Sequence, residues 1–186
     1  MYNFLTSSGA VVTQFSVKSY NNSIRAAIRA SKYIIPEEKR KNKSIYQMNY
    51  STPRLYNQLK THKQDFPIRP VVATYTCPSF NLAKFLSLWF RSVTGFNSLH
   101  GLQNSTQLAH ELLGMRFTSD CRLISFDVVS MFTNISIEKT VDIMYEILVK
   151  AGMTIDIADE FETLILLCVK RNLCQFDGKI FEFPGG

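Results

Sequence analysis

One aspartate within a short apolar run constrains this chain more than any other feature. Asp127 follows Phe126 and precedes Val128, and the apolar residues on both sides predict a buried strand over residues 123–129. A carboxylate buried there costs several kcal/mol unless it is paired, capped or bound to a cation. A helix cap or a hydrogen-bonded core position would satisfy Asp127, and so would a metal ion. On this stretch alone the structural role is favoured, because structural aspartates far outnumber catalytic ones.

The composition indicates a globular chain with a moderate excess of positive charge. Its 186 residues are 46% hydrophobic, which is enough for a packed core in one domain or in a piece of a larger protein. The 21 Lys and Arg against 15 Asp and Glu give a net charge of +6, which suits a polyanionic partner but is common in other proteins. We expect the distribution of charge to matter more than its total.

Cysteine usage and the absence of a targeting pattern indicate an intracellular protein. The four cysteines form no C-x-x-C pair and the three histidines lack zinc-finger spacing, which predicts reduced thiols. The N-terminal residues show no signal-peptide pattern, and no apolar run reaches roughly 18 residues, so no membrane insertion is expected. The abrupt start at Met1 and the final Pro184-Gly185-Gly186 predict a fragment.

Apolar periodicity and turn residues predict an α+β chain. A helical period with capping residues at its ends indicates helices over residues 23–35, 80–94, 105–113, 137–151 and 157–173. Alternation about a polar turn predicts hairpins over residues 53–73 and 174–183, the second around Asp177-Gly178. Trp89 falls on the apolar face of the second helix and is expected in the core. The charged run 37–43 is expected to form a solvated loop.

The first hairpin carries the basic side chains that could contact phosphate. Lys60 and Lys63 offer point charges and Arg69 offers a guanidinium fork, with Tyr56 close by in sequence. The alternative is that these lysines only guard the edge of a sheet against pairing with other chains. For the hairpin taken alone, edge protection is favoured.

Three stretches taken together resemble a reverse transcriptase of the Penelope-like retroelement group, the branch that looks closest to telomerase. Residues 53–72 with the helix that contains 81–86 are similar to the fingers signature of that group. Residues 125–134 resemble its motif A, and residues 175–181 resemble the hairpin that leads into its motif B. The resemblance covers about residues 20–186. It implies the fingers and partial palm of a right-hand polymerase, with fingers over about 20–120 and the start of the palm over about 121–186.

The resemblance implies a metal site at motif A. Nucleotidyl transfer uses two divalent cations that activate the primer 3′-hydroxyl and stabilise charge on the phosphates. Asp127 would then be a catalytic residue and a Mg²⁺ ligand, and the backbone carbonyl of Val128 would be a second oxygen donor. This role would answer how the predicted buried carboxylate is satisfied.

The resemblance also implies a nucleotide site. Phe132 stands where the family has an aromatic steric gate against the ribose 2′-hydroxyl, which implies a preference for deoxynucleotides. Arg69, together with Lys60 or Lys63, would hold the triphosphate, where a preset cation is worth several kcal/mol in the transition state. The implied partners are an RNA template, a DNA primer and a dNTP, and the implied location is nuclear.

The sequence departs from the family in what it lacks. The family continues with a Met-Gly-Ser-Pro-Leu run and a Tyr-x-Asp-Asp turn that carries two further catalytic carboxylates, and this sequence stops at Gly186 before both. The GIY-YIG endonuclease that is common in the group is also missing. One aspartate cannot hold two Mg²⁺ ions with useful affinity. We therefore expect a fragment, truncated before motif B, that does not polymerise alone.

Three other interpretations remain open from the sequence. The chain could be a non-catalytic nucleic-acid-binding remnant of a retroelement that keeps the basic fingers. It could be a decayed product that folds poorly, because half a palm exposes strand edges and apolar surface. It could also be an unrelated α/β protein with a chance match.

Overall fold

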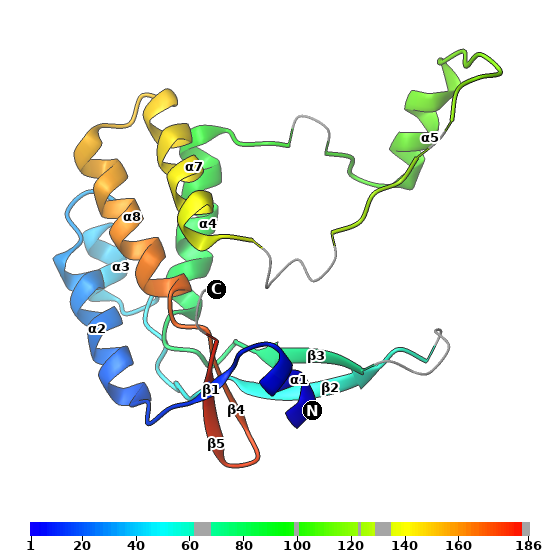
Figure 1. Ribbon diagram of the computed structural model, residues 1–186. Coiled ribbons are helices and arrows are strands. Elements are labelled where there is room, and N and C mark those ends of the chain that lie inside the picture. The colour runs from blue at the N-terminus through cyan, green and yellow to red at the C-terminus, as the bar shows by residue number, and fades with distance from the viewer. Residues whose placement is uncertain (62–67, 99–100, 123, 129–134, 184–186) are drawn as a thin grey trace.

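The chain is mixed α+β, with a group of helices beside a five-stranded sheet (Figure 1). The computed structural model describes residues 1–61, 68–98, 101–122, 124–128 and 135–183. The described helices are α1 (Tyr2–Ser7), α2 (Val17–Ala30), α3 (Glu37–Lys41), α4 (Phe80–Thr94), α5 (Ser105–Leu113), α7 (Ile137–Lys150) and α8 (Ile155–Val169). The described strands are β1 (Val11–Val12), β2 (Arg54–Leu59), β3 (Ile68–Ala73), β4 (Leu173–Phe176) and β5 (Lys179–Glu182). The expected α+β class is confirmed.

Two antiparallel hairpins make up most of the sheet, whose strand order is β1-β5-β4-β2-β3. Strands β2 and β3 pair with each other, as do β4 and β5, so both predicted hairpins are confirmed. The hairpins meet where β2 and β4 run parallel, with Arg54 in register with Gln175. There the backbone N–H of Gln175 donates to the carbonyl of Pro53 at 2.7 Å. We call this junction the seam.

The second hairpin turns at the predicted Asp-Gly pair. Asp177 and Gly178 both have positive φ, at 49° and 73°. A two-residue turn with positive φ at both positions matches the twist of the flanking strands. One face of the sheet is covered near this hairpin by α1, whose Leu5 is buried against Leu55, Cys174 and Phe181.

The main core lies between helices α2, α4, α7 and α8. The predicted helix at 80–94 is confirmed as α4, which ends where Gly95 takes a left-handed conformation. Phe161 of α8 is buried and stacks on Trp89 with the ring centroids 5.6 Å apart. Trp89 is therefore a core residue, as expected. The structure also confirms the predicted helices at 105–113 and 137–151, as α5 and α7.

Helix α2 differs from the helix predicted over residues 23–35 at both ends. It begins earlier because the hydroxyl of Ser16 caps it and accepts a hydrogen bond from the N–H of Ser19 at 3.2 Å. It ends at Ala30 because Ser31 leaves the helical conformation, and the N–H groups after it bond to a carboxylate on α8.

Two smaller expectations were also wrong, one about the charged run 37–43 and one about the end of α8. The run 37–43 contains the short helix α3, stabilised by an i,i+4 ion pair between Lys41 and Glu37 at 2.8 Å, although none of its residues is buried. Helix α8 ends at Val169, earlier than expected, because Leu173 already belongs to β4.

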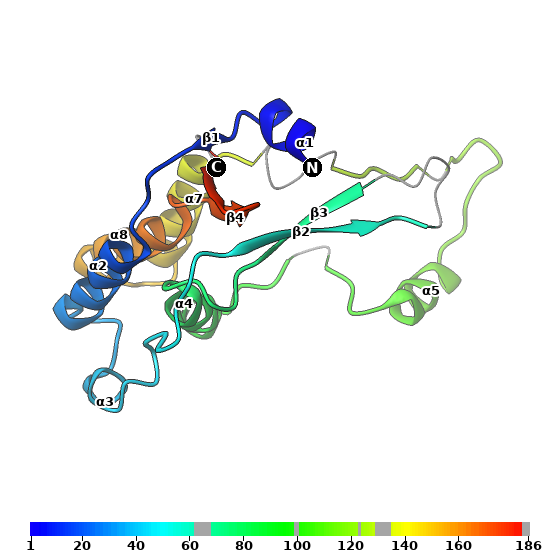
Figure 2. The same cartoon turned by 90° about the horizontal axis from the view of Figure 1, so that it is seen from below.

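The buried strand predicted around Asp127 is wrong for the residues that the structure describes. Residues 124–128 have no regular secondary structure and are exposed, and Phe126 is 93% exposed. A strand needs a neighbour to complete its hydrogen bonds and to cover its apolar face, and the described sheet has no strand there. Figures 1 and 2 show α5 and the chain on either side of it as an excursion away from the helices and the sheet.

Candidate nucleic-acid interface

The alternation of side chains along the first hairpin places polar residues on one face of the sheet. Arg54, Tyr56 and Gln58 alternate along β2, and Arg69 on β3 lies opposite Gln58. Gln175 joins them because it is in register with Arg54 across the seam. We call this set the arginine face. The opposite face holds Leu55 and the residues under α1.

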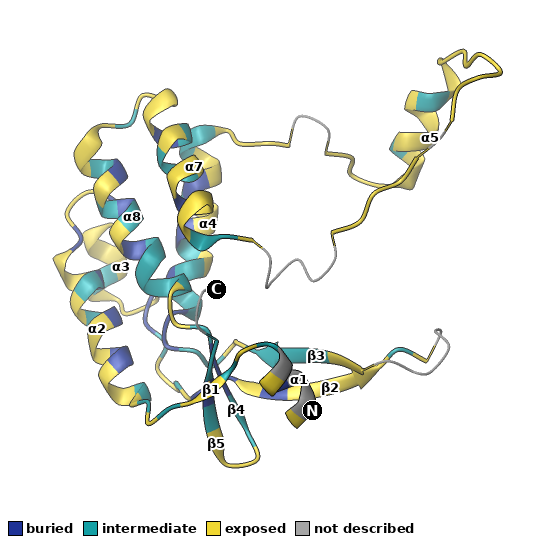
Figure 3. Cartoon of the chain, in the orientation of Figure 1, coloured by how far each residue is buried: buried dark blue, intermediate teal, exposed yellow. Residues whose placement is uncertain are grey.

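The arginine face is open to solvent. Arg54, Tyr56, Gln58 and Arg69 are exposed and Gln175 is half-buried. Figure 3 shows that most of β2 and the outer part of β3 are exposed, in contrast to the buried positions on the helices. The face therefore presents two guanidinium groups, an aromatic ring and amide groups to solvent, which are the groups that bind phosphates and stack on bases.

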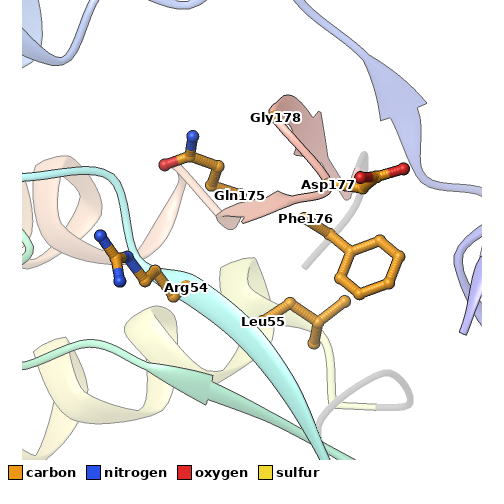
Figure 4. A pocket seen from close by; sticks show the side chains of 6 residues that line it. All are labelled: Arg54, Leu55, Gln175, Phe176, Asp177 and Gly178. Atoms are coloured by element: carbon orange, nitrogen blue, oxygen red, sulfur yellow. The ribbon is translucent and has the colours of Figure 1, made fainter.

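Two shallow hollows flank Arg54. The first has a volume of about 260 Å³ and is lined by Arg54, Leu55, Gln175, Phe176, Asp177 and Gly178. The second has a volume of about 220 Å³ and is lined by Ser51, Arg54, Ala73, Tyr75 and Thr76. Figure 4 shows the Arg54 and Gln175 side chains on one side of the sheet and Phe176 and Leu55 on the other.

Among the described residues, no carboxylate lies within ion-pair distance of Arg54. The carboxylate that lines its first hollow, that of Asp177, instead accepts a hydrogen bond from the hydroxyl of Tyr2 at 2.5 Å. The same bond is the main cause of the raised pKa of Tyr2. Arg54 is thus left free to contact a ligand.

Charge is divided unevenly between the two halves of the chain. Residues 1–98 contain 14 Lys and Arg and 3 Asp and Glu, whereas residues 99–186 contain 7 and 12. The positive half comprises α2, α3, the first hairpin and α4, and the negative half includes α7 and α8. The first hairpin thus belongs to the part of the sequence with excess positive charge, which suits a polyanionic partner, although α4 of that part packs against α7 and α8 of the other. The net charge of the whole chain does not show this uneven distribution, but counting charged residues separately in each half of the sequence does.

The predicted nucleotide-binding residues are only partly placed. Arg69 is exposed on β3, and Lys60 is half-buried just after β2. Lys63 and Phe132 lie outside the described residues. The prediction missed Arg54 and Gln175, because only the pairing of β2 with β4 brings these two side chains together.

The predicted metal ligands lie in an exposed segment without regular secondary structure. Asp127 and Val128 are exposed, and within the described ranges Asp127 has no hydrogen-bond or ion-pair partner. No group of three or more His, Cys, Asp or Glu that could hold a metal occurs in the described parts of the chain. A carboxylate and a carbonyl are donors that Mg²⁺ prefers, but this pair is too small for a two-ion site. No catalytic step follows from these residues alone.

Comparison with protein-family models, with curated proteins and with solved structures finds no match to this chain. Among the helices that the structure describes, none is both long and apolar enough to cross a membrane.

Proposed function

We propose that the chain supplies the fingers and the first part of the palm of an RNA-directed DNA polymerase of the Penelope-like type. The observation that supports the proposal is that residues 54–59 and 68–73, which resemble the fingers signature, pair as a hairpin that presents Arg69 on an exposed face without a carboxylate partner among the described residues. The proposed partners are an RNA template, a DNA primer and a dNTP, in the nucleus. The uneven charge of the chain supports a partner rich in phosphate.

In this proposal the arginine face acts by binding and positioning. The planar guanidinium of Arg69 can form two parallel hydrogen bonds to phosphate oxygens, which fixes orientation as well as charge. Asp127 contributes one of the carboxylates that hold Mg²⁺, an ion that neutralises charge on the phosphates when bound. The sequence contains no Tyr-x-Asp-Asp turn that would contribute the others. The 186-residue chain is therefore proposed to bind nucleic acid and not to polymerise alone.

The test is binding of a labelled RNA–DNA primer–template by the purified chain at several salt concentrations. We expect a clear salt dependence and a loss of affinity on the order of tenfold for Arg69→Ala. The control is Arg91→Ala, which removes an exposed arginine in the last turn of α4. Equal affinity of the wild type, Arg69→Ala and Arg91→Ala would refute a role for the hairpin. Primer extension by the purified chain would refute the proposal that it does not polymerise alone.

A second candidate is a non-catalytic nucleic-acid-binding module descended from such a polymerase. It is favoured by the exposure of Asp127, which belongs to no group of three or more His, Cys, Asp or Glu among the described residues. The two candidates differ in how nucleotide binding responds to Mg²⁺. If the chain is a polymerase fragment, Mg²⁺ should strengthen its binding of dNTP and Asp127→Ala should weaken it. If the chain is a binding module, Asp127→Ala should leave the binding of a nucleic-acid strand unchanged, and Mg²⁺ should not change the binding of dNTP.

A further inference from the structure

The position of Arg54 in the sheet is not explained by protection of an edge. Lysine and arginine often lie on edge strands, where they prevent pairing with other chains. Strand β2 is interior, with β3 on one side and β4 on the other, so Arg54 has no edge to protect. Its side chain nevertheless reaches solvent, and no described carboxylate pairs with it. Edge protection therefore does not explain an exposed arginine without a described ion-pair partner on this interior strand, and the alternative is a ligand that it could bind.

The surroundings of Arg54 supply polar groups suited to a phosphate. Gln175 lies beside it on the same side of the sheet and offers an amide donor (Figure 4). On the other flank, the hydroxyls of Ser51 and Thr76 line the second hollow, where they are hydrogen-bonded to each other at 2.8 Å. A guanidinium, an amide and two hydroxyls around shallow hollows match the oxygen acceptors of a phosphodiester.

The spacing along β2 extends this site toward Arg69. Arg69 lies opposite Gln58, and Gln58 is four residues from Arg54, a separation of about 13 Å along the strand. One phosphate cannot reach both guanidinium groups, but successive phosphates of one strand can. Tyr56 lies between them on the same face and is 45% exposed, so its ring is available to stack on a base.

We propose that Arg54 and Gln175 form a phosphate contact for an extended single strand of nucleic acid that crosses the sheet from Arg69 to the seam. The inference rests on the proposed function, because it takes the hairpin as a nucleic-acid-binding element. It adds a second phosphate contact at Arg54, a path for the strand across the sheet, and a contact from Gln175 of the second hairpin. The turn at Asp177-Gly178 connects β4 to β5 and lines the first hollow together with Gln175.

The experiment measures fluorescence anisotropy of labelled single-stranded RNA and DNA of about 12 nucleotides, within the range that a single-strand site covers. The full 186-residue chain is compared with Arg54→Ala, Gln175→Ala, Arg69→Ala and the control Arg91→Ala. Arg54→Ala is expected to weaken binding on the order of tenfold and to lower the salt slope by about 1. Arg54→Lys keeps the charge and is expected to keep the slope while losing part of the affinity.

The variants separate failure of this inference from failure of the proposed function. If Arg69→Ala weakens binding but Arg54→Ala behaves like Arg91→Ala, the Arg54 contact is refuted and the hairpin keeps its role. If Arg54→Ala weakens only the binding of a free dNTP, the strand path is refuted. If the wild-type chain binds no strand at low salt, both proposals fail. Thermal melting of each variant tests whether a loss of affinity is caused by a loss of folding.

Discussion

The carboxylate of Glu160 on α8 accepts a hydrogen bond from the hydroxyl of Ser31 at 2.5 Å, which joins α8 to the loop after α2. The same carboxylate accepts hydrogen bonds from the backbone N–H groups of Lys32, Tyr33 and Ile34 at 2.8, 3.1 and 3.0 Å. One side chain thereby satisfies the donors of an irregular segment that would otherwise compete for water or for helix carbonyls. This contact is the physical reason why α2 stops at Ala30.

Replacing Glu160 is expected to destabilise the fold. Glu160→Ala removes a charged acceptor from four donors and should lower the free energy of unfolding by about 2–3 kcal/mol. Glu160→Gln keeps one acceptor oxygen and should cost less. Urea unfolding followed by the fluorescence of Trp89, the one tryptophan in the sequence, measures both changes. Glu162→Ala on the same helix is the control and should stay within about 0.5 kcal/mol, and equal effects at 160 and 162 would contradict the role of Glu160.

The stability should also depend on pH through Glu160. Burial raises the pKa of Glu160, but the hydrogen bonds from Ser31 and the backbone N–H groups outweigh it, so the pKa lies below the ordinary value of 4.5. A lowered pKa in the folded state adds stability above pH 4.5 that is lost as the pH falls through the folded pKa. Urea unfolding between about pH 3 and pH 7 should show a smaller acid loss for Glu160→Gln than for the wild type. If the free energy of unfolding fell with pH equally in the wild type and Glu160→Gln, the carboxylate of Glu160 would not contribute to the pH dependence.

Local sequence signals predicted the parts of this fold that depend on local interactions. The Asp177-Gly178 pair and the apolar spacing of α4 fix the backbone within a few residues, and the structure agrees with both. The interaction of Glu160 with Ser31 spans 129 residues and leaves no local signal. The same limit applies to the candidate site, because Arg54 meets Gln175 only through a parallel pairing of distant strands.

The predicted strand at 123–129 failed for a related reason. Apolar residues around Asp127 match a buried strand, but a strand forms only beside another strand, and the apolar pattern does not contain its partner. In the structure the described residues there are exposed instead. The predicted roles of Asp127 and Arg69 therefore stay predictions, whereas the hairpin that presents Arg69 is confirmed.

The turn of the second hairpin should be destabilised by a side chain at Gly178. Gly178 has a φ of 73°, a conformation that L-residues other than glycine rarely adopt, so Gly178→Ala should cost about 1 kcal/mol through strain alone. Gly114→Ala is the matched control, since Gly114 has a φ of −88° and open space around it. It should be neutral or stabilising by up to about 1 kcal/mol. Urea unfolding of both variants measures the difference between their free energies of unfolding. Equal values would show that the turn of the hairpin does not lie at Gly178.

The four free cysteines should differ strongly in reactivity. Hydrogen bonds to Thr118 lower the pKa of the exposed Cys121, so more of it is thiolate at a given pH. Burial raises the pKa of Cys168 to about 12 and that of Cys174 to about 11, so both should react slowly. Alkylation by iodoacetamide, mapped by peptide mass, should label Cys121 before these two. Thr118→Val should slow Cys121, and an unchanged rate would show that the hydrogen bond has no influence.

A pair of identical substitutions tests whether Phe126 is exposed, as in the structure, or buried, as the sequence predicted. Phe161 is 1% exposed and packs against Trp89 and Phe90, so Phe161→Ala should cost about 3–5 kcal/mol and shift the emission of Trp89. Phe126 is 93% exposed, and Phe126→Ala should change the free energy of unfolding by no more than about 0.5 kcal/mol. Urea unfolding measures both. A cost at Phe126 close to that at Phe161 would mean that this residue is buried after all, and that the charge of Asp127 beside it needs a cap, a hydrogen-bond partner or a bound cation.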